Sequence, residues 1–319
     1  MPIVSNSKYN PLLLLSNKHI NTIIPSLFRK VDIEYQRERL QTPDNDFIDL
    51  DYSSKGNNKV VLVLHGLEGS SKSSNVKGIV NISNLNNYDA VVLNFRGCSG
   101  EPNKLLSAYH SGKTDDIDLV IRHLSSKYNS ISTIGFSLGG NALLKYLGEG
   151  HPSVELIKKA VAISVPCDLK SSALQMAKTS NSVYMKRFLK TLKHKVFKKC
   201  KTHTDHSIDL MKIKGSKTFA DFDNEYTAPV HGFKNAELYW ELNSCKPFLK
   251  KITTPTLLIN ALDDPFLTPD CFPFEIAKTS NSLFLETPKK GGHMGFLSNT
   301  GINGIYWHEK RAIEFLTKK

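Results

Sequence analysis

The sequence predicts an α/β protein in which a mostly parallel, doubly wound sheet carries an inserted helical cap. Short apolar runs rich in β-branched residues alternate with segments of helical spacing along most of the chain. The run at 59–64 is almost continuously aliphatic, as expected of a strand that is buried on both faces of a parallel sheet. Two later strands are separated by about ninety residues, although a crossover connection usually needs far fewer. These three observations together specify the fold class.

The elements follow from local sequence in chain order. Residues 1–30 contain a short helix and a turn. The segments 33–40 and 47–52 have strand-like composition around a turn at 42–46, which predicts an antiparallel hairpin over one edge of the sheet. Strands and helices then alternate, with strands expected at 59–64, at 90–95, in a run ending at Ile134, and at 160–165, 256–261 and 282–286, and helices at 74–85, 113–127, 138–147 and 305–316.

The long interval between two strands, residues 166–251, is expected to be an inserted helical cap. Residues 1–165 and 252–319 then form the core, and the two parts make a single structural unit. Aromatic residues of the cap either line a pocket or form the cap's own core, and the candidates are Phe188, Phe197, Phe219, Phe222, Tyr226 and Phe233.

Basic residues set the net charge at +12 at pH 7, and their densest cluster lies between Lys186 and Lys201. Apolar residues recur there at helical intervals, which predicts a basic amphipathic helix. A packed helix and a helix on an anionic membrane both produce this pattern, so peripheral membrane contact through Lys186 to Lys201 stays open. No nucleic-acid-binding motif accompanies the charge, and nucleic acid is not expected as a partner.

The five cysteines are odd in number, scattered and never spaced as CxxC, which argues against a disulfide framework or a structural zinc site. No apolar run is long enough to span a bilayer, and the N-terminus lacks the features of a secretory signal. We therefore expect a cytoplasmic protein with reduced thiols. The sequence leaves the oligomeric state unknown.

The stretch Gly135-Phe136-Ser137-Leu138-Gly139 follows a predicted strand and precedes a predicted helix. A serine at such a corner has the setting of a nucleophile elbow, where a sharp turn lifts the hydroxyl above the edge of the sheet. The tight turn explains glycine two residues before and two residues after the serine. Ser137 is therefore the candidate nucleophile.

A serine nucleophile needs a base and an acid that orients the base, in the chain order serine, acid, histidine. His293 fits best as the base, because it follows the last strand in a Gly-Gly-His-Met-Gly loop at the edge where ligands of such sheets gather, whereas His231 and His308 fit less well. Asp263 and Asp264 follow the penultimate strand and compete for the role of the acid. The residue that does not orient the histidine is expected to cap or hydrogen-bond the loop.

The sequence leaves those two aspartates open, with Asp168 as a third candidate. An oxyanion hole also needs two backbone N–H donors, and the natural pair is Leu138 and Leu67, the latter in the turn after the first parallel strand. His65 ends that buried strand and precedes the elbow, so we expect it to make a structural hydrogen bond and not to act as the base.

With these features in place, the sequence resembles the α/β-hydrolase superfamily and, within it, the YheT-like and embryogenesis-associated esterases of AB hydrolase family 4. The resemblance implies that the charge-relay residues are Ser137, Asp264 and His293. Met294 is a departure, because relatives carry valine there. The matching stretches span nearly the whole chain and are 21–29, 65–70, 94–103, 109–112, 135–141, 263–266 and 291–296.

We therefore expect a serine carboxylesterase that hydrolyses short- to medium-chain acyl esters through an acyl-enzyme, with no metal or organic cofactor. The acyl-ester substrate class is implied by the resemblance, as is the alternative of a lipid or monoacylglycerol lipase. A second alternative is an acyltransferase, for which the His110-x4-Asp115 spacing is a weak signal. A third is a non-catalytic binding protein on the same fold, against which the intact set of serine, aspartate and histidine argues.

Overall fold

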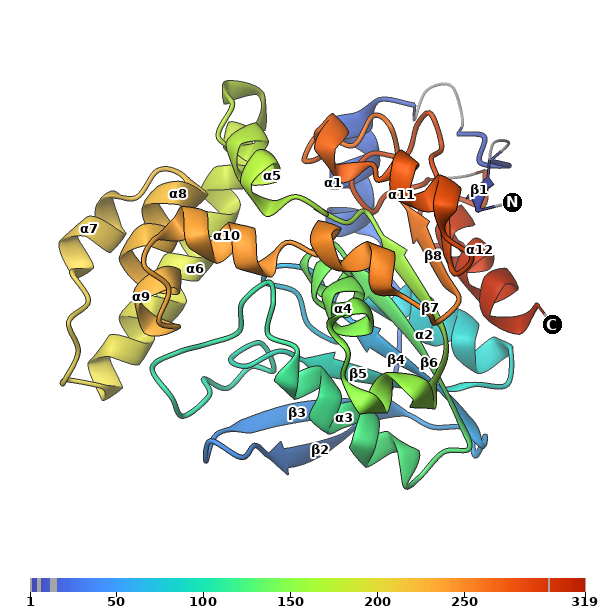
Figure 1. Ribbon diagram of the computed structural model, residues 1–319, viewed down its shortest axis with the longest axis horizontal. Coiled ribbons are helices and arrows are strands. Elements are labelled where there is room, and N and C mark those ends of the chain that lie inside the picture. Colours follow the sequence, from blue (N-terminus) through green and yellow to red (C-terminus); the bar gives the residue numbers. More distant parts are fainter. Residues whose placement is uncertain (1, 5–6, 12–15, 298, 319) are drawn as a thin grey trace.

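The structure is a computed structural model that describes residues 2–4, 7–11, 16–297 and 299–318. Within these residues, nine strands form one sheet in the order β1-β9-β8-β7-β6-β4-β5-β3-β2 (Figure 1). Neighbours from β1 across to β5 pair in parallel, whereas β3 pairs antiparallel with both β5 and β2. The predicted mostly parallel sheet is confirmed. The strands are β1 (Ile3–Val4), β2 (Gln36–Gln41), β3 (Phe47–Ser53), β4 (Lys59–Leu64), β5 (Asp89–Asn94), β6 (Ser130–Phe136), β7 (Ile157–Ile163), β8 (Thr256–Ile259) and β9 (Leu283–Glu286).

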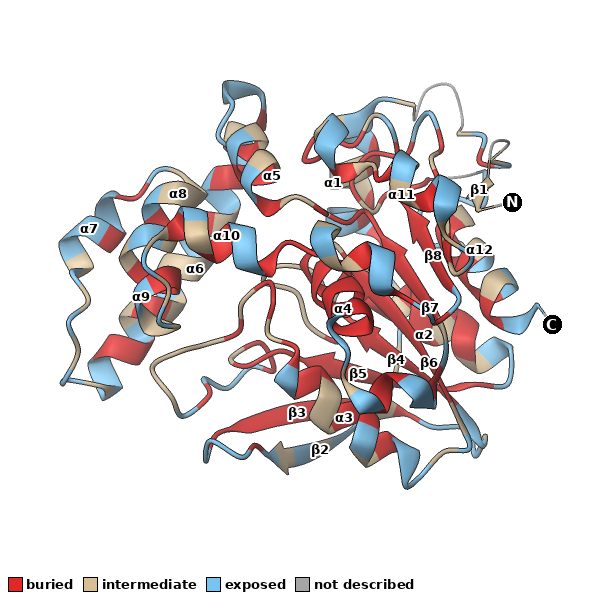
Figure 2. Cartoon of the chain, viewed as in Figure 1, coloured by how far each residue is buried: buried red, intermediate tan, exposed pale blue. Residues whose placement is uncertain are grey.

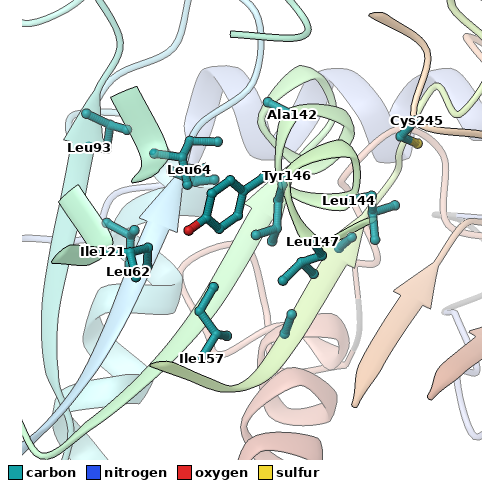
Figure 3. Close-up of a cluster of buried hydrophobic side chains, with 14 of the residues drawn as sticks. Leu62, Leu64, Leu93, Ile121, Ala142, Leu144, Tyr146, Leu147, Ile157 and Cys245 are labelled. Carbon is teal, nitrogen blue, oxygen red and sulfur yellow. The ribbon is translucent and has the colours of Figure 1, made fainter. Parts of the chain in front are cut away.

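Helices cover both faces of the sheet, because the central strands are apolar on both sides. In β4, Leu62 and Leu64 pack with α3 and α4 on one face, and Val61 and Val63 pack with α2 and α12 on the other. Figure 3 shows the ring of Tyr146, on α4, beside Leu64, and Figure 2 shows the buried sheet between the helices. Outside residues 166–251 the helices are α1 (Lys18–Phe28), α2 (Ser74–Leu85), α3 (Asp115–Ser125), α4 (Leu138–Glu149), η2 (Pro152–Leu156), η6 (Pro269–Cys271), α11 (Phe274–Thr279) and α12 (Trp307–Thr317).

The predicted hairpin is confirmed, since β2 pairs antiparallel with β3 and lies at one edge of the sheet. Strand β7 begins earlier than the predicted start at 160, because Ile157 already pairs with Ile131 before a register shift. Outside residues 166–251, the described elements β1, η2, η6 and α11 were not predicted. Each has six residues or fewer, so none shows a repeating apolar pattern.

Residues 166–251, here called the cap segment, lie between β7 and β8, and Figure 1 shows α6 to α10 at the left of the sheet. The predicted basic amphipathic helix is confirmed as α6. Two apolar clusters are built mainly from this segment. One surrounds Tyr239 and Trp240, and the other surrounds Leu189 and Phe222 and also includes Phe266, outside the segment. The division of the chain at residues 165 and 252 stays a prediction. Its helices are α5 (Leu169–Met176), η3 (Thr179–Asn181), α6 (Ser182–Thr202), α7 (Leu210–Gly215), α8 (Phe219–Phe222), the π-helical turn η4 (Asp223–Thr227), α9 (Ala228–Val230), α10 (Ala236–Asn243) and η5 (Lys246–Lys251).

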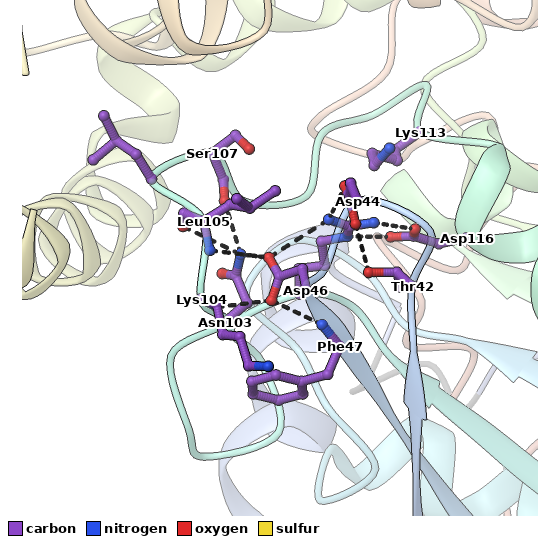
Figure 4. Close-up of polar contacts among 12 residues, drawn as sticks. Thr42, Asp44, Asp46, Phe47, Asn103, Lys104, Leu105, Ser107, Lys113 and Asp116 are labelled. Atoms are coloured by element: carbon purple, nitrogen blue, oxygen red, sulfur yellow. Dashed lines mark hydrogen bonds and ion pairs between the residues drawn. The ribbon is translucent and has the colours of Figure 1, made fainter.

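The loop after β5 is held in place by buried charges. Arg96 forms ion pairs with Asp44 at 2.6 Å and with Asp116 at 2.7 Å. Figure 4 shows Asp46, whose carboxylate accepts the backbone N–H of Lys104 at 2.7 Å. These contacts tie the loop to the turn between β2 and β3 and to α3, and residues of the loop form one wall of the cavity described below.

All five cysteines are buried and free. In the part of the chain that the structure describes, no helix combines the length and the apolar character that crossing a membrane requires. The same residues contain no cluster of three or more His, Cys, Asp or Glu side chains that could hold a metal ion.

Candidate active site

Ser137 lies between the end of β6 and the start of α4, at the corner that the sequence predicts. Its backbone φ is 49°, a sparsely populated conformation that costs about 1–3 kcal/mol in a residue with a side chain. A Cβ on Gly135 would lie 2.7 Å from the carbonyl oxygen of Gly139, and a Cβ on Gly139 would lie 2.7 Å from that of Leu64. The chain therefore makes the tight strand-to-helix turn of a nucleophile elbow, and only glycine fits on either side of it.

The structure brings Ser137, His293 and Asp264 together. Nε2 of His293 lies 3.0 Å from Oγ of Ser137, and Nδ1 lies 2.8 Å from Oδ2 of Asp264. Since a carboxylate only accepts hydrogen bonds, Nδ1 carries the ring proton and Nε2 is free to accept the proton of the serine hydroxyl. His293 and Asp264 are both buried, which shields the bond between them from bulk water, whereas the bond to Ser137 faces the cavity. The catalytic roles of the three residues stay a prediction.

The structure separates the three candidate acids. Asp264 contacts the imidazole and also accepts the backbone N–H of Phe266 at 2.9 Å. Asp263 accepts the backbone N–H of Gly292 at 3.0 Å, and burial raises the pKa of its carboxyl. Asp168 lies at the N-terminus of α5, where its side chain caps the helix. Asp264 therefore faces the histidine, and Asp263 holds the backbone of the loop, as expected of the other aspartate.

The other candidate histidines make contacts away from Ser137. His65 donates from Nδ1 to the carbonyl of Gly66 at 2.7 Å and accepts at Nε2 the N–H of Phe95 at 3.1 Å, which confirms the expected structural hydrogen bond. Burial lowers the pKa of His65 to about 4, so its ring is neutral at physiological pH. His308 is buried against aromatic rings, and burial lowers its pKa to about 3. His231 lies in the cap segment against another histidine ring.

Leu67 and Leu138, the candidate oxyanion donors, line the same cavity as Ser137. Leu138 is the first residue of α4, so its N–H is among those that have no partner within the helix. The turn that carries Leu67 passes close to the serine, since a Cβ on Gly66 would lie 3.3 Å from that of Ser137. Their role as donors stays a prediction.

Glu68, next to Leu67, is held by residues that sequence reasoning missed. Its φ is 57°, and the hydroxyl of Tyr109 both accepts its N–H and donates to its Oε1, each at 2.8 Å. Nζ of Lys195, on α6, lies 2.8 Å from the same oxygen and 3.2 Å from Sγ of Cys98. The cap segment is thus tied to the turn of Leu67. No local pattern signals these contacts, because the partners are 41 and 127 residues away.

Helix α1 positions the loop of His293, which sequence reasoning also missed. Oγ1 of Thr22 accepts the N–H of His293 at 2.9 Å, and Oδ1 of Asn21 accepts that of Leu297 at 2.9 Å. A Cβ on Gly295 would collide with the carbonyl of Asn21, so the loop and α1 are in backbone contact. No local pattern signals these contacts, because Thr22 and His293 are 271 residues apart.

A cavity of about 890 Å³ opens above Ser137 and His293. The aromatic residues predicted for the cap line it, with the exception of Phe233, which packs against the rings of His110 and Tyr239. Phe222 and Tyr226 are also buried in the apolar cluster around Leu189. These two rings therefore both line the cavity and contribute to the interior of the cap segment. The His110-x4-Asp115 pair does not form a site, because Asp115 is exposed at the start of α3 whereas His110 packs among rings.

The family model described as "alpha/beta hydrolase fold" matches residues 59–300. The chain is 34% identical over 321 residues to "Putative esterase YheT" of Escherichia coli (strain K12), which covers 98% of this chain and 94% of that protein. It is 29% identical over 307 residues to "Phospholipase ABHD3" of Bos taurus, covering 93% of this chain and 74% of the relative.

A solved structure with a similar fold is that of an esterase from Pyrococcus furiosus. The TM-score is 0.61 at 19% sequence identity, and the match covers 91% of this chain and 96% of the other. At that identity the likeness shows the fold alone.

Proposed function

We propose that this chain, which belongs to the α/β-hydrolase fold family and to its YheT-like branch, is a serine carboxylesterase. The observation that carries the proposal is the unbroken hydrogen-bonded series from Oγ of Ser137 through His293 to the carboxylate of Asp264, at the floor of a cavity. Relatives named as an esterase and a phospholipase support ester hydrolysis as the reaction.

In the first half of the reaction, Ser137 attacks the carbonyl carbon of an ester while Nε2 of His293 takes the hydroxyl proton. Asp264 keeps the imidazole in the tautomer with the proton on Nδ1 and stabilises the imidazolium that forms. The N–H groups of Leu67 and Leu138 hold the negative oxygen of the tetrahedral intermediate. His293 then returns the proton to the leaving alcohol, and the acyl group stays on Ser137.

In the second half, water replaces the alcohol. His293 takes a proton from the water as it attacks the acyl-enzyme and then gives that proton to Oγ of Ser137, which releases the carboxylic acid. His293 takes and returns the proton in both halves, so the proposed reaction needs no further acid or base. The largely apolar lining of the cavity supports acyl esters of short to medium chain length as the substrate class.

The test is hydrolysis of p-nitrophenyl esters of increasing acyl length by the parent protein and by Ser137→Ala. We expect the variant to lose activity on the order of 10⁶-fold, because the nucleophile is gone, and to unfold at nearly the same temperature. Labelling of the parent, but not of the variant, by a fluorophosphonate probe gives an independent readout. Equal rates for the two proteins, or no turnover and no labelling of the parent, would favour a non-catalytic binding protein.

Two related activities use the same acyl-enzyme and are separated by the same assay. Adding a primary alcohol to the reaction measures acyl transfer against hydrolysis, since an acyltransferase forms the new ester in preference to the free acid. Replacing the p-nitrophenyl ester by a monoacylglycerol or a phospholipid tests for lipase activity. The phospholipid is chosen because one relative is named as a phospholipase. A higher kcat/KM for the lipid than for the simple ester would move the assignment from esterase to lipase.

A further inference from the structure

The positive charge of this protein is concentrated in the cap segment. Residues 166–251 hold seventeen Lys and Arg against eight Asp and Glu, whereas the rest of the chain holds 25 against 22. The cap segment therefore carries +9 of the net charge of +12. Such a distribution favours binding to an extended anionic surface.

The charge gathers on the exposed face of α6. We call this face the basic stripe, and it consists of Val183, Lys186, Arg187, Lys190, His194, Lys198 and Lys201. These residues are three or four positions apart, so they share one side of the helix, while Leu189 and Val196 face the interior of the cap segment. Arg187 donates a hydrogen bond to Ser26, and within the described residues neither Arg187 nor any lysine of the stripe pairs with a carboxylate.

The basic stripe borders the mouth of the cavity. Lys190 and Lys198 line the cavity and are also exposed to solvent, which places them at its rim. Exposed residues of the loop 96–102 line the cavity as well. The carboxylate of Glu101 in that loop pairs with Arg39 at 2.8 Å, so its charge is compensated.

We propose that the basic stripe docks on a bilayer that contains anionic phospholipids, with the mouth of the cavity turned toward the lipid. The ammonium and guanidinium groups meet lipid phosphates, and Val183, which is 70% exposed, enters the interface with the aliphatic stems of the lysines. A bilayer fits this surface better than a nucleic acid does, because the stripe borders the mouth of a largely apolar cavity. The docking goes beyond ester hydrolysis and does not require Ser137 to act as a nucleophile.

The experiment measures co-sedimentation of the protein with vesicles. The protein carries Ser137→Ala so that no lipid is cleaved, and the vesicles are phosphatidylcholine alone or an equal mixture of phosphatidylcholine and phosphatidylglycerol. We expect binding to the mixed vesicles only, weakening as salt is added. The triple variant Lys186→Gln, Arg187→Gln, Lys201→Gln is expected to bind the mixed vesicles about 100-fold more weakly, because each basic residue at an anionic surface contributes separately.

The matched control is Lys55→Gln, Lys59→Gln, Lys158→Gln, which removes the same charge from exposed positions outside the cap segment and is expected to change the affinity by less than about threefold. Both triple variants, with Ser137 intact, should hydrolyse a soluble p-nitrophenyl ester like the parent, which also shows that they fold. Equal weakening by the two triple variants, or binding of an RNA duplex in place of the mixed vesicles, would overturn the proposal. Loss of ester hydrolysis with intact vesicle binding would instead count against the proposed function.

Discussion

The core, residues 1–165 and 252–319, and the cap segment differ in what their residues contribute to the cavity. Ser137, Asp264 and His293 all lie in the core, on turns that follow β6, β8 and β9. The cap segment contributes aromatic and basic side chains to the walls and the rim. From this comparison we expect the core to carry the proposed chemistry and the cap segment to influence which substrates are preferred.

The glycines around Ser137 differ from those of the cap segment. A Cβ on Gly135, Gly139 or Gly140 would meet other atoms of the core at 2.7 Å or less, whereas a Cβ on Gly215 or Gly232 of the cap segment would meet no atom within 4 Å. Close backbone contact leaves the turn around Ser137 no room to adjust. Substitutions that touch the core turns should therefore have large effects, and those in the cap segment should change preference more than rate.

The largest effect is expected from the acid of the core. Asp264→Asn should lower kcat on the order of 10⁴-fold, because an amide does not keep the imidazole in the productive tautomer. Asp263→Asn should cost less than about tenfold, since an amide oxygen still accepts the N–H of Gly292. Steady-state hydrolysis of a p-nitrophenyl ester measures both. The opposite ranking would show that Asp263 is the orienting acid.

Next comes the tight turn itself. Gly139→Ala should lower the free energy of unfolding by about 3 kcal/mol and abolish most activity, because its Cβ collides with the backbone of Leu64 and His65. The matched change in the cap segment is Gly215→Ala, at the end of α7, which should leave stability within about 1 kcal/mol of the parent. Urea unfolding of the three proteins measures the difference. Similar losses for both variants would remove the contrast between core and cap.

A smaller effect is expected from the cavity wall. Phe188→Ala enlarges the cavity, so the ratio of kcat/KM for a longer acyl ester to that for a shorter one should rise about tenfold. Phe272, also half-buried but not part of the lining, provides the control Phe272→Ala. A chain-length series with p-nitrophenyl esters gives the ratio. An unchanged ratio for Phe188→Ala would show that acyl chains do not occupy this wall.

The smallest effect concerns a buried acid of the cap segment. Burial raises the pKa of Asp223 from 3.8 to about 6, although Thr227 and Trp240 donate hydrogen bonds to its carboxylate. Between these values the folded protein keeps a proton that the unfolded chain loses, so raising the pH through this window favours unfolding. The stability of Asp223→Asn relative to the parent should therefore increase from pH 4 to pH 6 and then level off. Urea unfolding at several pH values measures it, and a constant difference would contradict the assignment.

Local sequence was enough for much of the core. The alternation of Val61 and Val63 with Leu62 and Leu64 signals a strand covered on both faces, and that pattern depends only on neighbours along the chain. The glycines at 135 and 139 likewise signal a turn whose tightness is a local property. Contacts between residues far apart in the sequence have no comparable local pattern. Thr22 and His293 are 271 residues apart, and nothing in either stretch indicates that one holds the other.

The sequence by itself determined the order of the longer strands and helices outside the cap segment, the serine at the corner between β6 and α4, and the candidates for the remaining site residues, because each depends on patterns within a few residues. Those patterns left Asp263 and Asp264 open, and only the family resemblance favoured Asp264. Tertiary structure shows that Asp264 faces the imidazole, and it alone decided that α1 supports the histidine loop and that Lys195 reaches Glu68 from the cap segment. Adjacent aspartates are equivalent along the chain, and they become different only when the folded backbone points one carboxylate at His293 and the other at Gly292.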